Sequence, residues 1–236
     1  MTLMLIFIFG LVMGSVLNFL IYVLTKDESI AIRPLHCKFC EIQLKILDLI
    51  PVLSWLLHRG KCRYCGEKKH YRYPVTEFVN AMVWVLIIWQ WGLTLQGLFG
   101  LFLFSLSLVI SQIDLEHYII PNRLVLILLL FGIMYHILVQ DLTLLNRFFG
   151  LVLGFIVPFL MAVISRGGMG AGDIKLMAAI GWWLGFPGVI YALFVGSLLG
   201  SIIGVILITL RLKKRKDPIP FGPFLVFGFL IIFFTG

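Results

Sequence analysis

The stretch SRGGMGAGDIKLMAAIGWW, residues 165–183, decides how often this chain crosses a membrane. It joins two apolar runs, 147–165 and 187–210, each about long enough to span a bilayer as a helix of ~20 residues. Within the stretch, a cluster of glycines precedes Asp173, and a shorter apolar run, 174–184, follows it. Whether this shorter run also crosses the membrane sets the number of spans.

The composition of the whole chain excludes a soluble globular domain. Of its 236 residues, 61% are hydrophobic and 13% are charged, and the mean hydropathy is +1.08. Apolar runs also occupy 3–24, 76–91, 96–113, 123–140 and 221–235. Because these runs are continuous rather than alternating, they favour helices over membrane strands. We therefore predict an all-α polytopic membrane protein, and we expect its first run to be a retained helix rather than a cleaved signal peptide.

The basic residues predict the orientation in the membrane. The formal net charge is +8, and of the 19 Lys and Arg residues ten lie in 25–73 and five in 211–216. Such clusters mark the cytoplasmic side of a membrane protein. We therefore interpret them as signals for membrane orientation and expect no nucleic acid partner. If both clusters are inside, the parity of the runs requires 174–184 to cross. The prediction is about eight transmembrane helices, with both termini outside.

All four cysteines lie in the polar segment 26–73, as CKFC at Cys37 and Cys40 and CRYC at Cys62 and Cys65. Two CxxC pairs about twenty residues apart predict a tetrahedral zinc site. Two disulfides, four ordinary buried thiols or a redox role are alternatives, and the reducing cytoplasm disfavours the disulfides. Because four thiolates leave no open position for water, we expect a structural zinc that stabilises a small cytoplasmic domain between helices 1 and 2.

Acidic residues are rare in the apolar part of the chain, where ionisable groups are costly and often mark function. Between residues 74 and 210 they are Glu77, Asp114, Glu116, Asp141 and Asp173. We expect Asp141 to be a solvated loop residue and Glu77 to be a first-turn acid that suits the helix dipole. Asp114 and Asp173 both fall at the predicted cytoplasmic boundary, where they could meet.

A pair of aspartates at one site suggests proteolysis. Two carboxylates that share a site divide the acid and base roles, as in aspartic proteases, and could hydrolyse a peptide bond directly. The glycines ahead of Asp173, including Gly170 and Gly172, would let a substrate strand approach because their backbone is permissive. Alternatively, each aspartate is a helix-end residue that faces headgroups and water.

Over almost its whole length the chain resembles the type IV prepilin peptidases, which are aspartic proteases of the GxGD class. The matching segments, in family order, are GSVLNFLIYVL (14–24), IPVLSWLLHRGKCRYCGEKKHYRYPVTE (50–77), DLEHYIIPN (114–122), GMGAGDIKLMAAIGWWLG (168–185) and IPFGPFL (219–225). The resemblance implies that Asp114 and Asp173 are the catalytic pair. It also implies that the four cysteines bind zinc.

The resemblance further implies an enzyme of the bacterial inner or plasma membrane, with its active site and zinc domain on the cytoplasmic side. Its partners would be the lipid bilayer and a prepilin or pseudopilin, whose short basic leader is cleaved after a glycine at the membrane face. Many members also methylate the new N-terminus with S-adenosylmethionine. No glycine-rich nucleotide fingerprint on a strand–helix unit occurs here, so no residue is assigned to that step.

The expected division of the chain is a first transmembrane helix in 1–24, a zinc-binding domain in 25–75 and a transmembrane protease domain in 76–236. Two other functions remain as alternatives. A transporter would place its acids near mid-span along a pathway. An assembly scaffold would need the zinc module and neither aspartate. The sequence indicates neither the pilin system served nor the oligomeric state.

Overall fold

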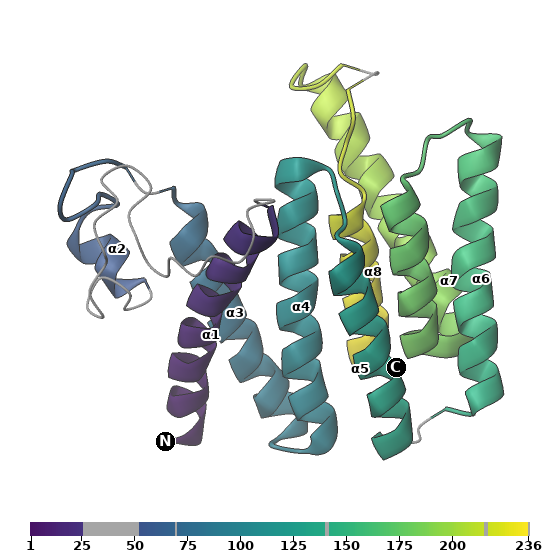
Figure 1. The fold of residues 1–236 in the computed structure, drawn as a ribbon, viewed down its shortest axis with the longest axis horizontal. Helices are drawn as coiled ribbons and strands as arrows, with labels where there is room; N and C mark the ends of the chain where they lie inside the picture. The colour runs from purple at the N-terminus through teal and green to yellow at the C-terminus, as the bar shows by residue number, and fades with distance from the viewer. Residues whose placement is uncertain (26–51, 69, 140–141, 215–216, 236) are drawn as a thin grey trace. The chain divides into compact units, whose positions relative to one another are not determined.

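The computed structural model describes residues 1–25, 52–68, 70–139, 142–214 and 217–235 (Figure 1). Its helices are α1 (Thr2–Thr25), α2 (Leu53–Leu57), α3 (Arg72–Trp91), α4 (Leu95–His117), α5 (Asn122–Val139), α6 (Leu144–Ile164), α7 (Ala171–Thr209) and α8 (Gly222–Thr235). Within the described ranges there is no strand, and the β-pairing is a single isolated bridge between Lys61 and Lys68. The prediction of an all-α membrane protein is confirmed.

Five of the described helices are long and apolar enough to cross a membrane: α1, α4, α5, α6 and α7. Helix α3 falls outside this group, and so does α8, which is apolar but has only 14 residues. Every predicted apolar run coincides with a helix, and α7 contains both 174–184 and 187–210. The count of eight crossings remains a prediction.

The chain divides into two compact units, Met1–Val109 and Ile110–Gly236, and each is described by itself. In the first unit, α1 packs closely on α3 because two glycines in α1 leave room for the α3 backbone. A Cβ atom on Gly10 would lie 2.6 Å from Cα of Ala81, and one on Gly14 would lie 2.5 Å from Cα of Glu77. The spacing of four residues places both glycines on one face of α1.

The expected role of Glu77 as a first-turn acid is wrong, because α3 begins at Arg72 and has no acidic residue in its first turn. Glu77 is instead 8% exposed and accepts hydrogen bonds from two other parts of the unit. The hydroxyl of Ser15 in α1 donates to Oε1 at 2.5 Å, and the backbone N–H of Val52, beside α2, donates to Oε2 at 2.8 Å. Glu77 thus joins α1, α3 and the start of the segment that carries the second CxxC pair.

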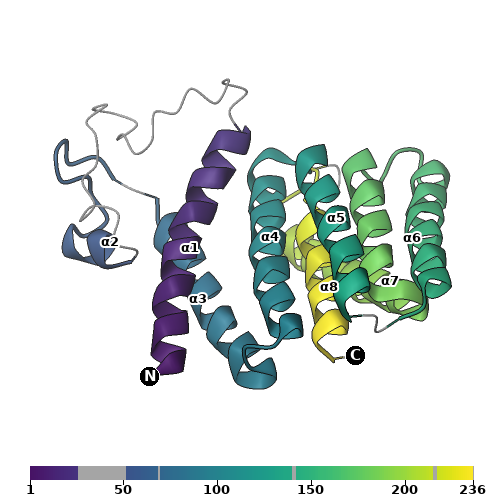
Figure 2. The ribbon, with the colours of Figure 1, turned by 60° about the horizontal axis from the view of Figure 1, so that its bottom comes forward.

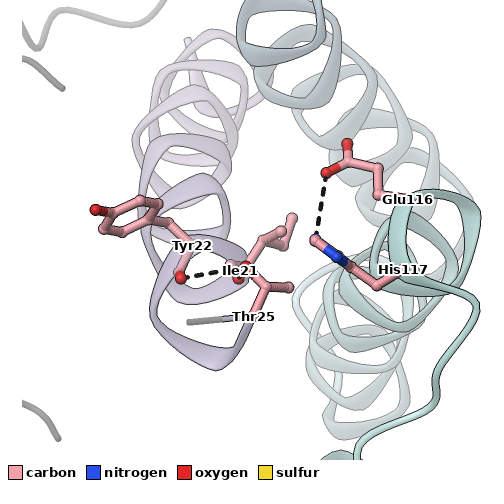
Figure 3. A network of polar contacts seen from close by, with 5 residues as sticks. All are labelled: Ile21, Tyr22, Thr25, Glu116 and His117. Carbon is pink, nitrogen blue, oxygen red and sulfur yellow. Dashed lines mark hydrogen bonds and ion pairs between the residues drawn. The ribbon is translucent and has the colours of Figure 1, made fainter. Parts of the chain in front are cut away.

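The C-terminal turns of α1 and α4 carry the local contacts drawn in Figure 3. At the end of α1, the hydroxyl of Thr25 donates to the carbonyl oxygens of Ile21 and Tyr22, at 2.9 and 3.2 Å. These bonds occupy carbonyls near the helix end. At the end of α4, Nε2 of His117 lies 3.9 Å from Oε2 of Glu116, and both side chains are solvent-accessible.

In the second unit, α6 and α7 run side by side (Figures 1 and 2). Their close approach depends on glycines in α6. A Cβ atom on Gly150 would collide with the carbonyl oxygen of Gly181, and one on Gly154 would collide with that of Met177. Small residues allow helix backbones to pack tightly in membranes, where dispersion replaces much of the hydrophobic driving force.

Helix α7 is broken near its middle, at Gly185 and Phe186, whose backbone angles are not helical. Gly185 has φ 63°, a conformation that favours glycine. The chain reverses there, so both ends of α7 lie at the same end of the unit as the start of α8 (Figure 1). The predicted short run therefore forms a half-helix of its own, with Asp173 in its first turn.

Residues at the start of α6 satisfy the backbone groups that this break exposes. The side-chain oxygen of Asn146 accepts from the N–H of Phe186 at 2.6 Å. The guanidinium of Arg147, which is fully buried, donates to the carbonyl oxygens of Trp182 and Trp183 at 2.9 and 3.1 Å. A cation suits the C-terminal end of a helix, where the carbonyls carry partial negative charge.

Candidate functional site

Three helix ends meet at one end of the second unit: the end of α4, the start of α7 and the start of α8 (Figure 1). Asp114 lies in the last turns of α4, and Asp173 lies in the first turn of α7. The two carboxylates are close enough to interact electrostatically. The structure thus brings together the two aspartates that the sequence analysis singled out.

Asp114 is only 5% exposed, and its environment is set by the start of α8. The backbone N–H of Gly222, the first residue of α8, donates to Oδ2 of Asp114 at 2.9 Å. A Cβ atom at position 222 would lie 2.8 Å from the same oxygen, so a side chain there would push the carboxylate aside. A carboxylate is stabilised at a helix N-terminus by the unpaired N–H groups and by the helix dipole.

Asp173 is held in a similar way by its own helix. Gly170 is the N-cap of α7, and its N–H donates to Oδ2 of Asp173 at 3.2 Å. The other oxygen, Oδ1, is buried and has no hydrogen-bond partner among the described residues. A buried carboxylate oxygen of this kind is a site where a water molecule would find an acceptor.

The two glycines beside Asp173 have ordinary backbone conformations. Neither Gly170 nor Gly172 has a positive φ, so neither conformation requires glycine. At Gly172 the absent side chain leaves room for Ile120, whose Cβ would lie 3.0 Å from a Cβ at that position. The small residue therefore serves packing inside the site. Gly167, further upstream, is the residue of this cluster that has positive φ, at 92°.

The connection between α4 and α5, residues 118–121, supports both aspartates through Ile120. This side chain is 9% exposed and lies against the open faces of Gly172 and Gly222. Next to it, Asn122 at the start of α5 accepts a hydrogen bond from Nζ of Lys175 at 3.0 Å. The motif DLEHYIIPN thus supplies an aspartate and also the contacts that fix α7 and α8 around it.

This arrangement can perform acid–base chemistry on a bound water. Two neighbouring carboxylates cannot readily both be ionised, so one can carry a proton while the other accepts one. Each has a backbone N–H donor that orients one of its oxygens. Aspartic proteases likewise use two neighbouring carboxylates.

Cys62 and Cys65, the described half of the predicted zinc site, lie on a tight turn. Cys62 is buried and Cys65 is exposed. The N–H of Cys62 donates to the carbonyl oxygen of Glu67 at 2.7 Å, and the N–H of Gly66 donates to the carbonyl oxygen of Cys62 at 3.0 Å. Gly66 has φ 73°, which closes the turn tightly. Such a turn fits one CxxC pair of a four-cysteine site.

Other expected residues lie outside the part of the chain that the structure describes, namely Cys37, Cys40 and Asp141. Within the described part, no three His, Cys, Asp or Glu side chains gather as a metal site. Zinc binding by the four cysteines therefore stays a prediction.

Sequence reasoning missed Gly222 and Ile120 as parts of the site. Gly222 acts through its backbone N–H, which every residue except proline has, so its type carries no signal of this contact. Its place inside IPFGPFL was the only indication, because that segment was one of the matching motifs. Ile120 is an ordinary apolar residue in sequence and is recognisable only once α7 and α8 are placed.

Known proteins resemble this chain over most of its length. Residues 8–91 match the bacterial peptidase A24 N-terminal domain, and residues 101–205 match the type IV leader peptidase family. A prepilin leader peptidase/N-methyltransferase of Xanthomonas campestris pv. campestris is 35% identical over 88% of this chain and 74% of its own length. Proteins with the same name from Bacillus subtilis and Neisseria gonorrhoeae are 32% and 30% identical, over 98% and 96% of this chain and 93% and 88% of their own lengths.

No solved structure matches the chain. The relatives are similar over nearly all of it, and the two matched families adjoin one another along the sequence. The chain belongs to the type IV leader peptidase family.

Proposed function

We propose that this membrane peptidase removes the leader peptide of type IV prepilins or pseudopilins, and that Asp114 and Asp173 are its catalytic pair. The observation that carries the proposal is that both aspartates lie where the end of α4 meets the starts of α7 and α8, each oriented by a backbone N–H, with Ile120 packed against Gly172 and Gly222. The curated relatives, which bear the name prepilin leader peptidase/N-methyltransferase, support the substrate class.

In the proposed reaction, a water held between the carboxylates attacks the carbonyl carbon of the glycine after which the leader is cleaved. The ionised aspartate takes a proton from the water as the C–O bond forms, and the protonated aspartate donates its proton to the oxyanion. As the tetrahedral intermediate collapses, the C–N bond breaks and a proton passes to the leaving amine. The two aspartates titrate as a coupled pair, so the roles belong to the pair.

The predicted topology completes this proposal. Residues 25–75 form a cytoplasmic domain in which Cys37, Cys40, Cys62 and Cys65 hold a structural zinc, and 76–236 form the transmembrane protease domain. The site then faces the cytoplasm, where the leader of the substrate lies, while the hydrophobic helix of the prepilin stays among the membrane spans. The asymmetric distribution of Lys and Arg supports this orientation.

The test is cleavage of a co-expressed prepilin by separate Asp114→Asn and Asp173→Asn variants, with Glu116→Gln as the matched control. Both aspartate variants should lose processing, because Asn can neither accept nor donate the proton of the reaction. The control removes an exposed carboxylate two residues from Asp114 and should process normally. Normal processing by either aspartate variant, at equal expression, would disprove the dyad.

We also propose that the enzyme methylates the new N-terminus with S-adenosylmethionine, since the name of its curated relatives includes N-methyltransferase. Mass spectrometry of the mature pilin gives a direct answer. A mature N-terminus that is about 14 Da heavier supports methylation, and an unmodified one limits the enzyme to proteolysis.

A further inference from the structure

The start of α8 is held against the end of α4 by a lysine outside the dyad. Nζ of Lys213 donates to the hydroxyl of Tyr118 at 3.1 Å and also to the carbonyl oxygen of Pro218. The same ammonium lies 5.3 Å from the centre of the Tyr118 ring, within the range of a cation–π contact. We call these contacts of Lys213 with Tyr118 and Pro218 the Lys213 bridge.

The two residues that Lys213 contacts are close in sequence to the two residues of the hydrogen bond between Gly222 and Asp114. Tyr118 follows Asp114 by four residues, and its N–H donates to the carbonyl oxygen of Asp114 at 2.9 Å. Pro218 precedes Gly222 by four residues, and the N–H of Gly222 is the group that holds Oδ2 of Asp114. The bridge therefore closes a ring of contacts that includes the carboxylate.

Position 222 is tightly packed against Asp114, so the site tolerates little movement of α8. Position 222 is buried, and any Cβ there would lie 2.8 Å from Oδ2 of Asp114 and 3.2 Å from Cδ1 of Ile120. A small shift of α8 would either lengthen the hydrogen bond of 2.9 Å or drive the backbone into the carboxylate. Helix α8 packs along α7, while the segment that leads into α8 is joined to the end of α4 by the Lys213 bridge.

We infer that Lys213 is a positioning residue for proteolysis: through its bridge from Tyr118 to Pro218 it fixes the N-terminal end of α8 against the end of α4, and so the place of the Gly222 amide that orients Asp114. The inference rests on the proposed role of Asp114. Lys213 does not touch the reacting atoms, and its effect passes through the helix end.

The neighbouring Lys214 provides a matched control. Both lysines belong to the same basic cluster, so replacing either removes the same charge from the topology signal. The side chain of Lys214 is exposed, and its backbone N–H donates to the side chain of Asp217. Lys213→Met and Lys214→Met thus differ in the bridge and in little else.

The experiment measures kcat, KM and the pH dependence of kcat for prepilin cleavage by purified full-length enzyme. For Lys213→Met we expect a loss in kcat on the order of tenfold, because small misplacements of a catalytic group are costly. KM should stay within about threefold, and Lys214→Met should resemble the wild type, as surface substitutions usually do. Lys213→Arg should restore most of the activity, since it keeps a cation that reaches both partners.

Two further variants separate positioning from a general loss of folded enzyme. Gly222→Ala should reduce kcat on the order of a hundredfold, whereas Gly204→Ala, whose Cβ would meet only Cδ1 of Ile219 at 3.4 Å, should not. Loss of folded enzyme would lower kcat by the same factor at every pH. Displacement of Asp114 would instead change the shape of the pH profile of kcat. The inference predicts a changed shape for Lys213→Met and Gly222→Ala.

Equal kinetics for Lys213→Met and Lys214→Met, or an unchanged profile shape, would overturn the inference. So would additive effects of Lys213→Met and Tyr118→Phe, because partners in one bridge must be coupled. These results would disprove only the role of Lys213, provided that Asp114→Asn is inactive. If Asp114→Asn cleaves normally, both the proposed function and the inference are wrong.

Discussion

Replacing Arg147 by Met should destabilise the second unit more than the loss of any exposed arginine. The guanidinium is fully buried, donates to the carbonyls of Trp182 and Trp183, and lies 5.6 Å from the ring centre of Tyr135. Each buried carbonyl left without a donor costs about 1–3 kcal/mol, so the two together cost about 2–6 kcal/mol. Since the variant also removes the cost of burying a charge, we expect a net loss of about 2–4 kcal/mol.

The free energy of unfolding can be measured by titration with SDS in mixed micelles, with tryptophan fluorescence as the signal. Trp182 and Trp183 adjoin the break in α7 and should report its loss directly. Arg123→Met, at an exposed position, is the control, and Arg147→Lys should fall between the two because an ammonium lacks the planar fork of a guanidinium. A loss below about 1 kcal/mol, the size of an ordinary interhelical hydrogen bond in a membrane, would refute the reasoning.

Two further predictions concern the first unit. Cys62→Ser should lower the zinc bound to protein purified under reducing conditions from about one equivalent to below about half. The control variant His58→Gln should retain its zinc. Full zinc in the Cys62 variant would contradict the four-cysteine site. Glu77→Gln should turn an N–H group toward the donor of either Ser15 or Val52 and weaken the attachment of α2 by about 1–3 kcal/mol. Faster hydrogen exchange of the amides of residues 52–60, without a change in α5, would show this, and unchanged exchange would argue against it.

Much of the helical architecture could be predicted because membrane helices are continuous apolar runs. The placement of Asp114 and Asp173 at the same membrane boundary could also be predicted, because the parity of the charged loops put both on one side. The sequence signal for the short half-helix was weak, with only 174–184 as an apolar run, and parity supplied the rest. In the structure this half-helix ends at a reversal that depends on Gly185.

The supporting contacts could not be predicted, for physical reasons that differ from case to case. Arg147 looks like the exposed Arg123 and Arg166 in sequence, and its burial follows from carbonyls exposed by a break elsewhere in the fold. Gly222 contributes a backbone group. Glu77 was misjudged because α3 starts four residues before the apolar run at 76–91, which moves this residue out of the first turn.

Two of the three helix segments that meet around the aspartates are short, which has a consequence for the surrounding lipid. A helix of 14 residues, such as α8, is about 21 Å long at 1.5 Å per residue, whereas the hydrocarbon layer is about 30 Å thick. The first part of α7, from Ala171 to the break at Gly185, is equally short. Bilayers adapt to such hydrophobic mismatch by thinning. Because both helices begin beside Asp114 and Asp173, thinning would draw headgroups and bulk water inward toward the carboxylates. The water needed for hydrolysis could then reach a peptide bond at the membrane face without a channel through the protein.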